Sequence, residues 1–293
     1  MAVNILVVVT ISFSLNLLGV RPYLTENGID YDSLLIFCAA FGFIGAFVSL
    51  GLSRIMAKMM MGVKVIDPSR PGSQTERELV QTVHRLAQKA GLPQMPQVGF
   101  YESPEVNAFA TGPSKSRALV AVSSGLLNQM DSESVEGVLG HEIAHIANGD
   151  MVTMTLIQGI INTFVMFFAR IAAWGVSQAM SGDRDRGRGA SPMIYWVTTM
   201  AFEILFSFFG MIIVAYFSRI REFRADKGGA KFAGREKMIS ALESLKRHSE
   251  RIDTNHGALT TLKINGRRGG LMAMLSTHPD LDARIARLRS TPL

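Results

Sequence analysis

The chain has 293 residues, of which 48% are hydrophobic and only 18% are charged. This composition is too apolar for an ordinary soluble protein and predicts a membrane protein. The net charge of +6 comes from Lys and Arg spread along the chain rather than interleaved with aromatic residues in one patch, which argues against nucleic-acid binding. The single cysteine, Cys38, excludes an internal disulfide and fits a folded part that faces the cytosol.

Two apolar runs predict a first membrane hairpin within residues 1–53. The runs cover residues 2–20 and 33–53, and each is long enough to span a bilayer as a helix. The first run lacks a basic start and a small-residue cleavage site, which indicates an uncleaved anchor rather than a signal peptide. Acidic residues dominate between the runs and basic residues follow from Arg54 onward, so the positive-inside rule places the following segment in the cytosol.

Residues 54–150 are expected to form the first part of a cytosolic domain. Apolar residues at helical spacing predict a helix within 72–91. A later helix is expected to begin at Asp131 as its N-cap and to end at Gly149-Asp150. Three short extended stretches between these helices predict a small β-sheet: 97–101, 106–110 and 118–122.

A second membrane hairpin is expected over residues 151–218. Its apolar runs, about 151–179 and 193–218, are each long enough to span. Tryptophan and tyrosine flank the Arg-rich and Gly-rich loop between them, as expected for an aromatic belt at a membrane interface. Basic residues after the fourth run outnumber those of the loop, so the hairpin is expected to cross the membrane and return to the cytosol.

Two charged residues, Arg170 and Glu203, interrupt the runs of this hairpin. Folding the hairpin about its midpoint places them at nearly the same depth. Because an unpaired charge inside a bilayer costs about 3 kcal/mol on insertion scales, we expect the two side chains to pair. The alternative is that both runs enter the membrane only partly and both charges stay in water.

Residues 219–293 are expected to form the second part of the cytosolic domain. Apolar residues at helical spacing predict a helix over 231–248 and a short last helix over 280–289. The stretch 252–276, rich in Gly, Thr and Asn, predicts a long loop or flap.

The helix predicted after Asp131 contains an H-E-x-x-H sequence. Residues four apart stand on one face of a helix, so His141 and His145 can offer two imidazole nitrogens to one metal ion, for which zinc is the natural choice. Glu142 is rotated away from that pair, which suits a general base acting on a water molecule. The alternative is an ordinary helix with two histidines.

A catalytic zinc ion needs three protein ligands and one open position. The extended form H-E-x-x-H-x-x-G-x-x-H is excluded, because Asn148 and Met151 occupy its last two fixed positions. Glu222 and Asp226 share a helix face directly after the fourth apolar run, and an antiparallel hairpin would return Glu222 to the histidines. Asp226 would then accept the second ring N–H of a ligating histidine. The alternative is a solvated basic helix start in which Glu222 pairs with an arginine.

These motifs resemble the HtpX family, membrane-bound zinc metalloproteases of bacteria related to the type I CAAX prenyl proteases. The resemblance implies His141, His145 and Glu222 as ligands of one zinc ion per subunit. It also implies Glu142 as the catalytic carboxylate and Asp226 as the partner of a ligand. It covers nearly the whole chain, with four apolar runs in the same order and four matching stretches: Pro104 to Gly112, Val135 to Asp150, Arg221 to Asp226, and Ser276 to Pro279.

Two further residues acquire expected roles from the resemblance. The spacing of Asn107 before the motif helix is similar to that in thermolysin-type proteases, where an edge strand holds the substrate backbone. By this resemblance Asn107 would bind a peptide carbonyl of the substrate. The alternative is an asparagine that only forms a turn. His278 resembles a histidine that could steady the oxyanion, and helix capping before Pro279 is the alternative. An edge strand near Phe109 or over 118–122 would hold the substrate extended by main-chain hydrogen bonds.

The expected fold is an α+β membrane protein: four transmembrane or membrane-embedded helices with a mostly helical cytosolic zinc-protease domain that carries a small β-sheet. The resemblance implies a multi-pass protein of the bacterial cytoplasmic (inner) membrane whose active site faces the cytosol. The expected activity is endopeptidase cleavage of misfolded or damaged membrane proteins in stress-related quality control. Unfolded or membrane protein substrates and the lipid bilayer are the expected partners, and the oligomeric state stays open.

Two alternatives to this function are a processing protease of narrow specificity, of the CAAX-protease type, and a non-enzymatic metal-binding scaffold. Four spans rather than a large helical chamber disfavour the first. A structural zinc site would close its fourth position with Cys or His, and Cys38 lies in a different membrane segment, which disfavours the second.

Overall fold

The computed structural model describes four stretches of the chain: residues 23–25, 28–180, 192–255 and 275–292. It divides into two compact units. The first combines residues 1–49 with 154–214, and the second combines residues 50–153 with 215–293.

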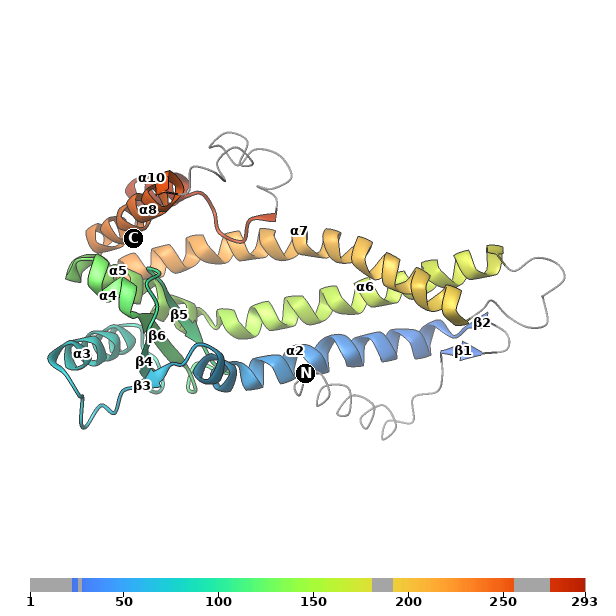
Figure 1. Cartoon of the computed structure of the whole chain (residues 1–293), viewed down its shortest axis with the longest axis horizontal. Helices are drawn as coiled ribbons and strands as arrows, with labels where there is room; N and C mark the ends of the chain where they lie inside the picture. Colours follow the sequence, from blue (N-terminus) through green and yellow to red (C-terminus); the bar gives the residue numbers. More distant parts are fainter. Residues whose placement is uncertain (1–22, 26–27, 181–191, 256–274, 293) are drawn as a thin grey trace. The chain divides into compact units, whose positions relative to one another are not determined.

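Three helices of the described residues are long and apolar enough to cross a membrane, judged by length and composition (Figure 1). They are α2 (Tyr31–Met60), α6 (Asp150–Met180) and α7 (Pro192–Ala233), and they correspond to the second, third and fourth apolar runs. The first expected span, 2–20, lies outside the described residues. In the first unit a short antiparallel pair, β1 (Leu24–Thr25) and β2 (Gly28–Ile29), precedes α2.

Glycines allow the apolar helices of the first unit to approach closely. A Cβ atom on Gly42 of α2 would lie 2.6 Å from the carbonyl oxygen of Gly159 in α6. A Cβ atom on Gly159 would in turn lie 2.9 Å from the ring of Phe43, and one on Gly210 of α7 would lie 2.8 Å from Ile161. Small residues at helix contacts are typical of membrane helices, whose association depends on close van der Waals packing.

The expected pair between Arg170 and Glu203 is confirmed. Arg170 Nη1 donates to Glu203 Oε1 at 2.7 Å and to the carbonyl oxygen of Met166 at 3.1 Å. The guanidinium also lies over the ring of Phe37, 5.4 Å from its centroid. The pair therefore offsets the charge of each side chain within a mostly apolar helix bundle.

Arg170→Leu alone is expected to destabilise the protein by about 2 kcal/mol more than Arg170→Leu combined with Glu203→Leu, because the single change leaves a carboxylate unpaired among apolar helices. Thermal unfolding in detergent of both single variants and the double variant measures this coupling. Equal loss of stability in the Arg170→Leu and double variants would contradict the interpretation.

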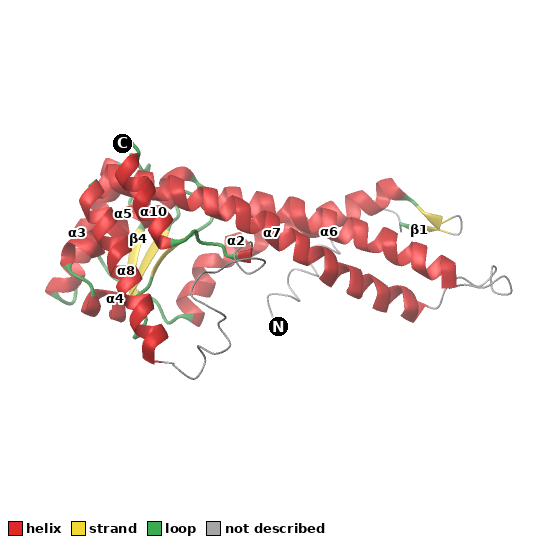
Figure 2. Ribbon diagram, turned by 90° about the horizontal axis from the view of Figure 1, so that it is seen from above, coloured by secondary structure: helices red, strands yellow, loops and turns green. Residues whose placement is uncertain are grey.

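The second unit contains a four-stranded sheet with the order β3–β4–β6–β5. Figure 2 shows strands of this sheet in yellow, with β4 labelled. Strand β6 is parallel to β4 and antiparallel to β5, and β3 is antiparallel to β4. The strands are β3 (Lys64–Val65), β4 (Gln97–Tyr101), β5 (Ala108–Thr111) and β6 (Leu119–Ser123).

The expectation that residues 118–122 could serve as an edge strand for substrate is wrong. Strand β6 covers most of this stretch, is buried at every position, and pairs on both sides, so its backbone groups are already taken. Strand β5, which contains Phe109, pairs only with β6 within the described part of the sheet. Of the two expected positions, only β5 therefore has an open strand edge.

Local signals set the ends of the helices in the second unit. Ser73 caps α3 by accepting from the backbone N–H of Glu76, and Asp131 caps α5 by accepting from that of Ser134, which confirms the expected N-cap. Gly149, with φ of 73°, ends α5 in the left-handed conformation that favours glycine. The helices are α3 (Gln74–Lys89), α4 (Ser124–Gln129), α5 (Ser132–Asn148), α8 (Arg235–Asn255) and α10 (Leu281–Ser290).

The expected helix over 231–248 is placed differently. Helix α7 continues through Ala233, and Gly234, with φ of 111°, separates it from α8. Helix α8 then extends to Asn255 and takes in the first residues of the expected loop 252–276. Most of that loop, 256–274, lies outside the described residues.

Small residues also bring α5 and α7 together in the second unit. A Cβ atom on Gly228 of α7 would lie 2.6 Å from the Cβ of Ala144, and one on Gly229 would lie 3.0 Å from the backbone nitrogen of His141. The opposite face of α5 enters the main core with α3 and the sheet. This close approach places Glu222, two turns before Gly229, beside the histidines of α5.

Candidate metal centre

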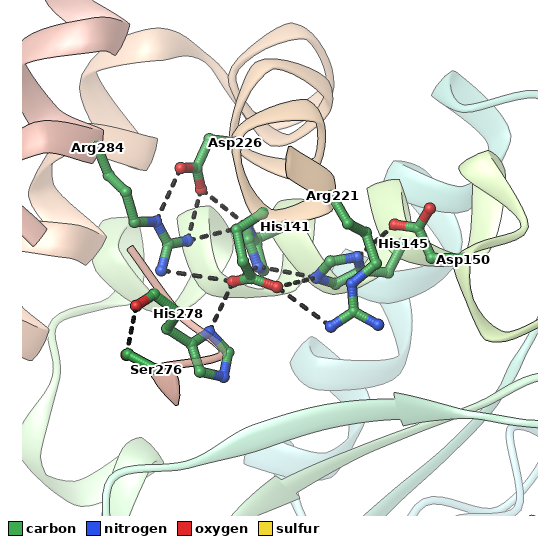
Figure 3. A network of polar contacts seen from close by, with 9 residues as sticks. His141, His145, Asp150, Arg221, Asp226, Ser276, His278 and Arg284 are labelled. Atoms are coloured by element: carbon green, nitrogen blue, oxygen red, sulfur yellow. Dashed lines mark hydrogen bonds and ion pairs between the residues drawn. The ribbon is translucent and has the colours of Figure 1, made fainter. Parts of the chain in front are cut away.

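Helices α5 and α7 bring His141, His145 and Glu222 to one point. Figure 3 shows the two histidines within the surrounding network of polar contacts. The Nε2 atoms of the two histidines are 3.0 Å apart. Glu222 Oε2 lies 3.5 Å from the Nε2 of His141, and its Oε1 lies 3.4 Å from the Nε2 of His145. All three side chains are buried, and their ligand atoms lie within 4.8 Å of one another, which is close enough to hold one metal ion.

A carboxylate holds the far nitrogen of each imidazole. His141 Nδ1 lies 3.0 Å from Asp226 Oδ1, and His145 Nδ1 lies 2.6 Å from Asp150 Oδ2. With each Nδ1–H donated to a carboxylate, both Nε2 lone pairs are directed to the common point. Sequence reasoning anticipated Asp226 but missed Asp150, whose signal was its position directly after the left-handed turn at Gly149 that ends the motif helix.

Sequence reasoning also missed Arg284, a buried side chain of α10. Its Nε donates to Asp226 Oδ2 at 2.8 Å and its Nη2 donates to Asp226 Oδ1 at 2.6 Å. Its Nη1 lies 3.6 Å from Glu222 Oε2. Arg284 therefore fixes the carboxylate that orients His141; the available signal was its place beside the apolar residues of the last helix.

The carboxylates make the centre favourable for positive charge. Burial opposes protonation of His141, but its hydrogen bonds to Asp226 and Glu222 raise its pKa. Burial likewise opposes protonation of His145, yet Asp150 and Glu222 raise its pKa to about 9. Glu222 is buried, which alone would raise its pKa, but hydrogen bonds from His141, His145 and His278 hold that pKa well below its usual range. The same electrostatics suit a divalent cation.

A cleft of about 160 Å³ opens beside two of the three ligands, His141 and Glu222. Glu142, half-buried, lines it together with Asn107, which directly precedes β5. The backbone of Asn107 is fixed by Ser123, whose N–H donates to the Asn107 carbonyl at 3.0 Å and whose Oγ accepts from the Asn107 N–H at 3.1 Å. The cleft thus joins an acid–base group, the ligand cluster and the open strand edge.

His278 lies at the same cleft and contacts a ligand directly. Its Nδ1 is 2.9 Å from Glu222 Oε2, and its side chain is 62% exposed. Asp280 is the N-cap of α10, accepting from the backbone N–H groups of Asp282 and Ala283. The alternative in which His278 caps this helix is therefore wrong.

The residues present fit a catalytic rather than a structural zinc ion. Two imidazole nitrogens and one carboxylate form a donor set typical of catalytic zinc, which keeps an open coordination position. Within the part of the chain that the structure describes, the cluster contains these three ligand side chains and no fourth histidine or cysteine. This composition argues against a closed structural site.

Asp150→Asn is expected to weaken zinc binding by about tenfold to a hundredfold, because the loss of its charge makes His145 a poorer ligand. Competition with a chelating dye measures the zinc affinity. Asp282→Asn is the matched control, since Asp282 is exposed and pairs only with Lys246 among the described residues. Unchanged affinity in the Asp150 variant would contradict the role assigned to that hydrogen bond.

The chain is similar to known peptidases. Residues 73–292 match the model of peptidase family M48. The chain is 54% identical over 294 residues to a "Protease HtpX homolog" of Bacillus subtilis, with 98% of this chain and 96% of the relative covered. It is 47% identical over 290 residues to a "Protease HtpX" of Shewanella halifaxensis, with 99% and 97% covered.

A solved structure has a similar fold. The crystal structure of S. mikatae Ste24p matches with a TM-score of 0.61 at 18% identity, covering 97% of this chain and 65% of that chain. At this identity the likeness concerns the fold alone. Since the family model spans most of the chain and the relatives align over nearly all of it, the chain belongs to peptidase family M48, among the HtpX proteases, and is a membrane protease.

Proposed function

We propose that the chain is a zinc metalloendopeptidase, in which His141, His145 and Glu222 hold one zinc ion per subunit and Glu142 is the general base. The observation that carries this proposal is the clustering of three buried ligand side chains, two of which, His141 and Glu222, line one cleft together with Glu142. Held by these three side chains, zinc would supply Lewis-acid chemistry toward the scissile carbonyl and the attacking water.

The side chains around the centre divide the remaining work. Glu142 takes the proton of the attacking water and passes it to the leaving amine, so no covalent enzyme intermediate forms. His278, exposed at the cleft and hydrogen-bonded through Nδ1 to Glu222, has Nε2 to offer the developing oxyanion. Asp150 and Asp226 keep the two imidazoles in the required orientation.

The open edge of β5 supports binding of an extended peptide. A substrate segment adds to this edge by main-chain hydrogen bonds, and Asn107 binds one of its carbonyl groups. Only unfolded chains and loops can take this conformation, which favours misfolded or damaged membrane proteins as substrates. Basic residues after the apolar run of α7 support an active site that faces the cytosol from the bacterial cytoplasmic membrane, in a quality-control role.

The test is cleavage of an unfolded model protein by the detergent-purified chain kept in chelator, before and after addition of one equivalent of zinc. Cleavage that returns with zinc, but not with magnesium, is the expected result. One zinc bound per chain without cleavage of the model protein or of membrane-protein loops would favour the metal-binding scaffold. Zinc-dependent cleavage confined to one short peptide sequence would favour a narrow processing protease.

A further inference from the structure

A second cavity, of about 250 Å³, lies between α7 and α10 in the second unit. Residues of α10 including Arg287 line one side, and five residues of α7 line the other: Ile220, Phe223, Arg224, Asp226 and Lys227. The cavity shares Arg284 with the catalytic cleft, but neither the zinc ligands nor Glu142 line it. The proposed peptidase chemistry therefore leaves this cavity without a role.

The charge of this cavity is strongly positive. Its lining has four cationic side chains and one acidic one, Asp226, which already receives two hydrogen bonds from Arg284. The other three cations, Arg224, Lys227 and Arg287, are exposed and form no ion pair with any residue that the structure describes. Like charges around one cavity repel one another, so an anion that contacts all three would be bound favourably.

The packing of Arg287 strengthens this interpretation. Its guanidinium lies over the ring of Phe223, 4.5 Å from the ring centroid, and Phe223 also lines the cavity. This cation–π contact restricts a long side chain that would otherwise be free to move. Arg224 and Lys227 stand on one face of α7, about one turn apart. The cationic groups are thus gathered around the cavity rather than spread over the surface.

The position of the cavity along α7 indicates the source of the anion. It begins two residues after the apolar run that ends at Ser218. In the same unit, the side chains of Tyr216, Phe217 and Ile220 are 55%, 42% and 39% exposed, which is unfavourable in water and suits contact with lipid chains. Exposed apolar side chains that are followed along the helix by a basic cavity are expected where a helix leaves an anionic membrane surface.

We propose that this cavity binds the phosphate group of an anionic phospholipid headgroup. The two guanidinium groups offer paired N–H donors that match phosphate oxygens, and Lys227 adds a compact positive charge. A zwitterionic headgroup carries the same phosphate but brings a quaternary ammonium group among three cations. Anionic lipid is therefore preferred over phosphatidylcholine. Binding requires no peptide cleavage, so its outcome is independent of the proposed peptidase function.

Native mass spectrometry of the zinc-loaded, detergent-purified full chain tests the proposal with three probes: dioctanoyl phosphatidylglycerol, dioctanoyl phosphatidylcholine and glycerol 3-phosphate. We expect one phosphatidylglycerol to bind at least tenfold more tightly than either other probe. The triple variant Arg224→Gln, Lys227→Gln, Arg287→Gln should bind it about a hundredfold more weakly, since each cation near an anionic surface contributes roughly fivefold. The charge-preserving triple Arg224→Lys, Lys227→Arg, Arg287→Lys loses two paired guanidinium donors but keeps the charge, so it should bind at least tenfold more tightly than the Gln triple, which separates loss of charge from loss of folding.

A control triple removes the same charge elsewhere in the second unit, with Arg70→Gln, Arg117→Gln and Lys231→Gln, all exposed and outside the cavity. It should leave phosphatidylglycerol binding within about twofold of the parent protein. An equal loss in both triples would overturn the proposal in favour of general attraction to a basic chain. Equal affinity for phosphatidylcholine would overturn the preference for anionic lipid. Tight binding of glycerol 3-phosphate would assign the cavity to a soluble phosphate ester instead.

Discussion

Glu142→Gln is expected to leave zinc binding intact and to lower kcat for cleavage of an unfolded protein by about a hundredfold to ten-thousandfold. Gln has nearly the same size and can still line the cleft, but it cannot accept a proton at neutral pH. Glu142 is not one of the three clustered ligands, so the metal affinity should stay within about threefold of the parent value. KM should change little, because β5 and Asn107 are untouched.

Single-turnover cleavage rates and zinc content, measured on the same preparation, check this expectation. Glu133→Gln is a matched control in the same helix, since Glu133 is exposed in the first turn of α5 and lies away from the cleft. The control should cleave at the parent rate. Loss of zinc together with activity in the Glu142 variant would make Glu142 a ligand, and retained activity would remove it from the reaction.

Local sequence patterns were sufficient to predict the helix that carries the histidines. The spacing of His141 and His145 fixes their common face through helical geometry alone, and Asp131 and Gly149 mark the helix ends through hydrogen bonds and backbone conformation within a few residues. Glu222 required a further step, the return of a hairpin, and the structure does bring it to the histidines. Each of these inferences depends on residues close in sequence or on an antiparallel hairpin of two consecutive helices.

The residues that sequence reasoning missed are those whose role depends on tertiary contacts. Arg284 belongs to a short basic helix, and its apolar neighbours indicate a buried position but not its partner Asp226, 58 residues earlier. Asp150 looks like a helix-terminal residue until the turn at Gly149 directs it to His145. The position of β6 inside the sheet depends on which strands pair, and alternation of apolar residues does not encode strand order.

Glu222→Gln is expected to weaken zinc binding by on the order of a hundredfold or more, because it removes the one carboxylate among the three clustered side chains that the structure describes. Glu222 is 1% exposed and lies within 3.6 Å of two histidine Nε2 atoms and of the guanidinium of Arg284. A zinc ion, unlike a protonated imidazole, keeps its positive charge when this carboxylate is lost. The Glu222→Gln change should therefore lower the zinc affinity more than the stability of the metal-free protein.

The metal-free protein should respond less, because Glu222 raises the pKa of His141 and His145, and its loss makes the neutral imidazoles more favourable. We expect the free energy of unfolding without zinc to fall by about 1–2 kcal/mol, as for a lost hydrogen bond. Calorimetric unfolding with and without zinc separates the two effects, and Glu243→Gln, which breaks an exposed pair with Arg289, is the control. If zinc affinity is unchanged while the metal-free protein is destabilised, Glu222 serves only to pair with its basic neighbours, and a different residue must complete the metal centre.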